Sequence, residues 1–170
     1  MLRGRIRKYI LATAVLLVIL AGLIFLVYLL SRPPTNIGAK SAEGYRHLFS
    51  IYGFEGDRLY RPTEVAIDKN GNIYVADTFK HRIVVFDSTG KFIRMFGEKG
   101  EKPTQIQFPS AVAVAPDGRV YVLSATQNKI VVYRGSKPYW VINVEKPLAV
   151  TIKKNRLYIT TARGIMIGDL

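Results

Sequence analysis

The sequence contains no cysteine. This absence excludes disulfide bonds, a thiolate zinc or iron–sulfur site, a thiol nucleophile, haem attachment through cysteine and lipidation of a cysteine. Histidine is also scarce, because only His47 and His81 are present and they do not form a pair with zinc-binding spacing. We therefore expect neither a cofactor nor a dedicated metal site.

Acidic residues are outnumbered, with 12 Asp and Glu against 25 Lys and Arg, which gives a formal net charge of +13. The acids are dispersed and stand mostly at turns, so no carboxylate cluster suited to calcium is visible. A basic surface is compatible with anionic lipids, envelope polymers or nucleic acid. The basic residues are not interleaved with aromatic residues in a nucleic-acid motif, and we expect no nucleic-acid partner.

One long apolar run stands near the N-terminus. Residues 9–30 carry no charge, and as a helix they would span about 33 Å, enough for the hydrocarbon core of a bilayer. The run is longer than the apolar core of a cleavable signal peptide, and no small-residue cleavage site follows it. The positive charges concentrate before the run, at Arg3, Arg5, Arg7 and Lys8. This asymmetry predicts a cytoplasmic N-terminus.

The N-terminal features together predict a single-pass protein of the cell membrane with a retained signal anchor. Residues 1–8 would be a cytoplasmic basic segment, 9–30 a transmembrane helix and 31–44 a polar linker. Residues 45–170 would then form an extracytoplasmic domain.

The remaining sequence repeats itself. Residues 61–68 align with residues 108–115 at an offset of 47 (109 − 62, from the two prolines), and a shorter third copy begins at Lys146. The first copy predicts four strands, near residues 64–68, 73–77, 82–87 and 91–96. The second of these runs is apolar on both parities, which is typical of a strand sandwiched between neighbouring sheets. We therefore predict an all-β fold of β-propeller blades, each with four antiparallel strands.

The first copy resembles the NHL repeat family. The residues that carry the resemblance are Pro62-Thr63-Glu64-Val65-Ala66-Ile67-Asp68, Gly71-Asn72-Ile73-Tyr74-Val75-Ala76-Asp77-Thr78 and Lys80-His81-Arg82-Ile83-Val84-Val85-Phe86-Asp87. The family pattern has Gly where this chain has Glu64 and Ala111. The resemblance covers the whole of residues 45–170 and implies a six-bladed propeller.

The number of blades does not reach six. If the four strands of a blade are called a, b, c and d in chain order, residues 47–53 resemble a strand d. The expected order along the chain is then d, abcd, abcd, abc, which amounts to three blades. Either the chain is a fragment of a longer propeller, or two chains form one six-bladed ring as a homodimer in which each supplies its first strand to the other. We favour the fragment, because abrupt ends within repeats are common in truncated reading frames.

Four residues at one predicted turn are the candidate blade-turn or partner-contact residues: Asp77, Lys80, His81 and Arg82. Asp77 and Arg82 flank one hairpin, where they are able to pair as a clasp. The second copy has Ser124 and Lys129 at these positions, which indicates an architectural role rather than catalysis. His81 stands at the Asn-His-Arg-Ile position of the NHL pattern and is interpreted as a turn residue.

The leading functional hypothesis is a non-enzymatic binding or scaffold module for a protein or a cell-envelope component. The alternatives are a propeller enzyme of the lyase or lactonase type with its active residues in missing blades, or a truncated product without function. Related propeller enzymes hold a metal at the central channel, and no such ligands are recognisable here. Fold resemblance alone does not supply an activity.

Overall fold

The computed structural model describes residues 17–27 and 46–170, which belong to two separate units divided after Leu48. Residues 17–27 are helical, and all of their side chains are exposed. No helix in the described part of the chain combines the length and the apolar character needed to cross a membrane. The predicted cytoplasmic segment 1–8, the whole of the predicted linker 31–44 and both ends of the predicted transmembrane helix lie outside the described residues.

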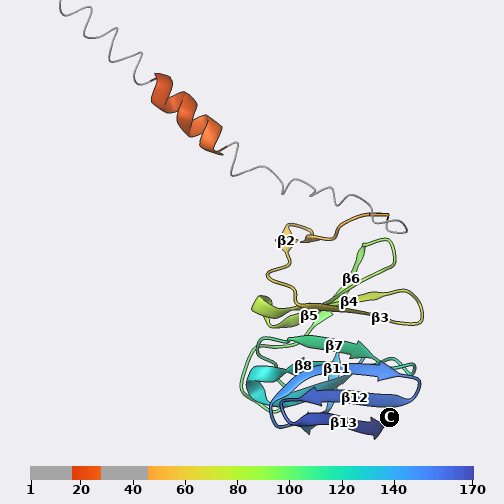
Figure 1. Cartoon of the computed structure of the whole chain (residues 1–170). Helices are drawn as coiled ribbons and strands as arrows, with labels where there is room; N and C mark the ends of the chain where they lie inside the picture. Colours follow the sequence, from red (N-terminus) through yellow and green to blue (C-terminus); the bar gives the residue numbers. More distant parts are fainter. Residues whose placement is uncertain (1–16, 28–45) are drawn as a thin grey trace, which may run out of the picture. The chain divides into compact units, whose positions relative to one another are not determined.

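Three of the antiparallel sheets in the second unit are blades, which Figure 1 shows stacked one upon another. Blade 1 consists of β3 (Glu64–Ile67), β4 (Ile73–Asp77), β5 (Arg82–Phe86) and β6 (Phe92–Phe96). Blade 2 consists of β7 (Ala111–Val114), β8 (Arg119–Ser124), β9 (Lys129–Arg134) and β10 (Lys137–Asn143). Blade 3 has three strands, β11 (Pro147–Lys153), β12 (Arg156–Thr161) and β13 (Gly164–Asp169). The predicted order of strands within each blade is confirmed.

Short turns explain why these runs pair with their neighbours in sequence. Between β3 and β4, the Asp68 carboxylate accepts hydrogen bonds from the backbone N–H groups of Asn70 and Asn72, at 2.8 and 3.0 Å. Gly71 has φ +82°, a conformation that a side chain disfavours. Aspartate that bonds its own turn, followed by glycine at positive φ, closes a tight hairpin and fixes its register.

The expected strand over residues 47–53 is wrong. The described part of this segment is not a strand until β1 (Gly53–Phe54), which forms a small hairpin with β2 (Asp57–Arg58). Glu55 and Gly56 both have positive φ, as a tight primed turn requires. Ile51 and Phe54 pack against the buried cluster of Val75, Val84 and Phe86 on blade 1. Within residues 47–53, Ile51 therefore packs against a sheet face instead of lying in a strand.

The core lies between the blades. One cluster joins Tyr74, Ala76, Ile83 and Val85 of blade 1 to Val112, Val120, Val122 and Tyr133 of blade 2, with Ile106 from the connecting loop fully buried among them. A second cluster joins the other face of blade 2 to Val150, Leu157 and Ile159 of blade 3. Blade 2 is thus apolar on both faces, as the sequence predicted for sandwiched strands.

The two outer faces of the stack are open. Val65 and Ile67 of β3 are 59% and 64% exposed, although the matching residues of blade 2, Val112 and Val114, are buried or half-buried. Every residue of β13 is exposed, and among the described residues this strand pairs only with β12. These are the surfaces that further blades would cover in a closed ring.

We expect replacement of Ile106 to destabilise the fold far more than replacement of an exposed isoleucine. Ile106→Ala removes a fully buried side chain from between two blades, which costs about 2–5 kcal/mol of unfolding free energy. The control Ile165→Ala, on exposed β13, costs less than about 0.5 kcal/mol. Urea unfolding of the full chain in mild detergent, followed by circular dichroism, measures both, and equal losses would contradict the core described above.

Candidate partner-binding surface

The predicted candidate residues meet where β4 turns into β5. Asp77 ends β4, η1 (Thr78–Lys80) makes one tight turn, and His81 leads into β5 at φ +55°. Asp77 is fully buried. One of its carboxylate oxygens accepts a hydrogen bond from the Tyr60 backbone N–H at 2.7 Å, and the other accepts one from Arg82 Nε at 2.8 Å. The predicted clasp between Asp77 and Arg82 is therefore present.

Asp57 of the β1–β2 hairpin completes this charged cluster. Its carboxylate pairs with Arg82 Nη1 at 2.6 Å and also with Lys80 Nζ. The hydrogen bond from Arg82, followed by the one from Lys80, holds the pKa of Asp57 well below its usual range. Burial by itself would lower the pKa of Arg82, but its bonds to Asp57 and Asp77 outweigh burial and raise it. The cluster fastens the N-terminal hairpin to blade 1.

His81 connects blade 1 to blade 2. Its Nδ1 accepts a hydrogen bond from the Phe108 backbone N–H at 3.0 Å, and its ring meets the Phe108 ring edge-on at 4.4 Å between centroids. Asn128, which follows η2 (Ala125–Gln127) in blade 2, also has positive φ. Its Oδ1 accepts a hydrogen bond from the Lys146 backbone N–H, also at 3.0 Å. Two different residues thus make the same link to the next blade, which is an architectural role.

Burial, followed by the nearby charge of Lys99, lowers the pKa of His81. The neutral ring suits its position, since Nδ1 must be unprotonated to accept the Phe108 N–H. No group of three or more His, Cys, Asp or Glu that could hold a metal ion occurs within residues 17–27 and 46–170. Of the four predicted residues, only Lys80 presents a substantial part of its side chain to solvent.

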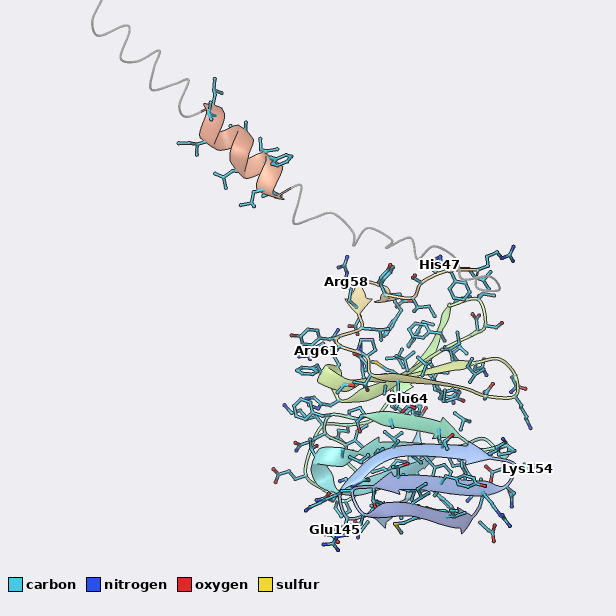
Figure 2. All side chains as sticks on the ribbon, viewed as in Figure 1. His47, Arg58, Arg61, Glu64, Glu145 and Lys154 are labelled. Atoms are coloured by element: carbon cyan, nitrogen blue, oxygen red, sulfur yellow. The ribbon has the colours of Figure 1, made fainter. Side chains whose placement is uncertain are left out.

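An exposed row of rings lies beside this buried cluster. Tyr60 and Phe79 are in edge contact at 5.4 Å, Phe79 and Phe108 at 5.6 Å, and the Arg61 guanidinium lies 4.6 Å from the centre of the Phe79 ring. We call Tyr60, Arg61, Phe79 and Phe108 the aromatic surface; all four are exposed. Figure 2 shows Arg61 on the side of the blades where η1 lies.

The sequence did not reveal the aromatic surface, because its residues come from separate loops and do not recur in the repeat. At the offset of 47, Tyr60 and Phe79 correspond to Gln107 and Thr126. This difference is itself a signal: an aromatic residue at a turn in one copy and a polar residue in the next indicates that the repeat architecture does not require the ring.

The chain is similar to known β-propeller proteins. Residues 60–148, just over half of the chain, match the model of the family DUF5128, described as a 6-bladed beta-propeller. The chain belongs to this family of six-bladed β-propellers. Its prediction as a β-propeller is confirmed, while assignment to NHL repeats in particular stays a prediction.

This chain spans less than half the length of the proteins it is compared with here. Protein brain tumor of Drosophila melanogaster is 35% identical over 76 residues, which are 45% of this chain and 7% of that protein. Hydrazine synthase of Kuenenia stuttgartiensis is similar in structure, with a TM-score of 0.54 at 18% identity over 76% of this chain and 36% of the other. U3-55K gives a TM-score of 0.56 at 14% identity over 68% and 37%. These structural likenesses show the fold alone.

We expect His81→Asn to reduce the acid sensitivity of the fold. The pKa of His81 in the folded protein lies below its ordinary 6.5. As the pH falls below 6.5, the unfolded chain therefore binds a proton at His81 before the folded chain does, and the free energy of unfolding decreases. Asparagine accepts the same backbone bond without titrating, as Asn128 does.

The measurement is the midpoint of thermal unfolding of the full chain between pH 7 and pH 5. The variant should lose less of its melting temperature than the parent over this interval. Identical slopes would show that His81 does not bear this pH dependence.

Proposed function

We propose that this propeller is a non-enzymatic binding module whose aromatic surface contacts a protein or a cell-envelope component. The observation that carries the proposal is the contrast between two neighbouring sets of residues. Asp77 and His81 are buried, Arg82 is half-buried, and all three hold the turns through hydrogen bonds. The Tyr60 and Phe79 rings next to them remain exposed, and blade 2 has polar residues at the matching positions.

A rigid set of exposed rings is well suited to binding. Aromatic side chains and arginine supply large contact areas at low entropic cost, and they dominate the energetics of protein interfaces. The turns that present Tyr60 and Phe79 are fastened by the Asp77 carboxylate and by a backbone bond from Phe79 N–H to Tyr60 C=O at 3.2 Å. Binding therefore requires little further ordering of the surface.

We also propose that the module is anchored in the cell membrane with the blades outside the cytoplasm. The support is the uncharged run of residues 9–30 and the basic residues before it. Within the described portion of the run, residues 17–27 are helical and expose large apolar side chains such as Leu17, Phe25 and Val27. A lipid environment would cover these side chains.

The binding proposal is tested by site-specific photo-crosslinking in cells that produce the full chain. A photoreactive residue at Arg61 should give a discrete adduct, and Phe79→Thr should reduce its yield about tenfold, because an aromatic anchor is lost. Threonine is the residue that blade 2 carries at the matching position, so the fold should be retained. A photoreactive residue at Thr89, in the turn at the opposite end of β5, is the control. Equal adducts from both positions would contradict the proposal.

We also propose that further blades cover the two open faces of the stack in a closed ring. A six-bladed ring needs three more, and these come either from a longer chain or from a second copy that pairs with the free edge of β13. The enzyme alternative, with its active residues in those blades, stays a prediction.

The mass of the detergent-solubilised chain, from light scattering corrected for detergent, separates the two sources of blades. If two copies close the ring, the mass is twice that of one chain, and Ile167→Lys on β13 restores the single mass by placing a charge at the interface. The control Ser136→Lys, in the exposed turn between β9 and β10 of blade 2, leaves the dimer intact, because blade 2 already has a neighbour on both faces. A single-chain mass for the parent protein would exclude the second copy as the source.

A further inference from the structure

A second exposed aromatic cluster lies on the outer strand of blade 2, apart from the aromatic surface. Tyr139 and Trp140 are adjacent in β10, and in a regular strand such neighbours point to opposite faces. Here the pairing of β10 with β9 shifts between Pro138 and Trp140, so Tyr139 is bulged. The two rings consequently lie together, with centroids 4.9 Å apart. Bulges often re-aim side chains at functional positions.

Two arginines flank the ring pair. The Arg119 guanidinium lies 5.3 Å from the Trp140 ring centre, and the Arg134 guanidinium lies 5.0 Å from that of Tyr139. We call these four residues the bulge cluster. Asp117 is the acid paired with Arg119, at 2.5 Å, and Lys137 adds a further exposed cation at the start of β10. The cluster and its neighbours therefore keep a positive balance.

The rings of the bulge cluster are not packing residues in the usual sense. Tyr139 is 52% and Trp140 is 40% exposed, and neither belongs to the buried clusters between the blades. Tryptophan and tyrosine with an apolar body and a polar tip favour the headgroup depth of a bilayer. Arginine guanidinium binds phosphate through two parallel hydrogen bonds. The combination matches the surface of an anionic membrane.

We propose that the bulge cluster docks the blade domain onto an anionic phospholipid surface; this rests on the proposed membrane anchorage, which would keep such a surface within reach. Trp140 and Tyr139 enter the headgroup region, and the exposed Arg134 and Lys137 bind lipid phosphates. Arg119, whose side chain is only 13% exposed and is paired with Asp117, supports the Trp140 ring. Docking would restrict how the tethered blades present their binding face. The bulge makes this possible by placing both rings on one side of an outer strand.

Trp140 is the single tryptophan of the chain, so its fluorescence reports on this cluster alone. The full chain is reconstituted into vesicles of zwitterionic lipid, or of the same lipid with phosphatidylglycerol, each containing lipid brominated near the headgroup. Docking predicts a blue shift and stronger quenching of Trp140 in the anionic vesicles. Each cation near an anionic surface contributes roughly fivefold to binding, so the cluster variant Arg134→Gln with Lys137→Gln lowers the ratio of docked to undocked protein about 25-fold.

The matched control removes two exposed arginines from blade 3, Arg156→Gln with Arg163→Gln, and should change the ratio by less than about twofold. If the cluster variant does not fold, high salt serves as a second measurement on the parent chain. At 1 M salt the screening length is about 3 Å, and the quenching should fall to the level of zwitterionic vesicles.

Equal quenching in both kinds of vesicle, or quenching unchanged by the cluster variant and by salt, would overturn the proposal. A blue shift with soluble polyphosphate but none with anionic vesicles would assign the cluster to a phosphate polymer and would equally overturn it. Flotation of the chain with zwitterionic vesicles tests the anchor separately, since it does not depend on the bulge cluster. Failure of the anchor and failure of the docking are therefore distinguishable.

Discussion

The packing of blade upon blade is the constraint on which the rest of the structure depends. Central strands such as β4 and β5 are buried on both faces, so each sheet is stable only between two neighbours. Blade 2 has both neighbours and is apolar throughout its inner strands. Blades 1 and 3 have one each, and the hairpin segment with Ile51 and Phe54 covers only part of the open face of blade 1. Exposed Val65 and Ile67 mark what remains uncovered.

Hydrogen bonds at the turns hold neighbouring blades in fixed positions relative to one another. His81 and Asn128 accept backbone N–H groups from the residues that begin the next blades, Phe108 and Lys146. Glu64 adds a link of another kind, because its carboxylate accepts the Val112 N–H at 3.2 Å and burial raises its pKa. Figure 2 shows Glu64 between the sheets of blades 1 and 2. These links fix the turns, and fixed turns give a rigid surface for a partner.

The positively charged residues do not all have the same role. Lys80 and Arg82 are engaged with Asp57 and Asp77, so their charges serve the fold. Arg61 and Arg134 instead lie over exposed rings. Arg119 does both, because it is paired with Asp117 and lies over the Trp140 ring. The two proposed contact regions are thus distinguished from the rest of the basic surface by their rings, and net charge alone would not have located them.

The sequence by itself determined the strands of the three blades, their order and the pairing of Asp77 with Arg82. Each follows from local rules: period-two apolar patterns, Asn-Gly and Asp-Gly turns, and two opposite charges flanking one hairpin. The tertiary structure alone decided that Ile51 packs on a sheet face instead of lying in a strand, because a strand forms only where a partner edge is within reach. It also decided which rings are exposed together, since Tyr60, Phe79 and Phe108 meet through loops far apart in sequence. The bulge that aligns Tyr139 with Trp140 depends on register with β9, which no local pattern specifies.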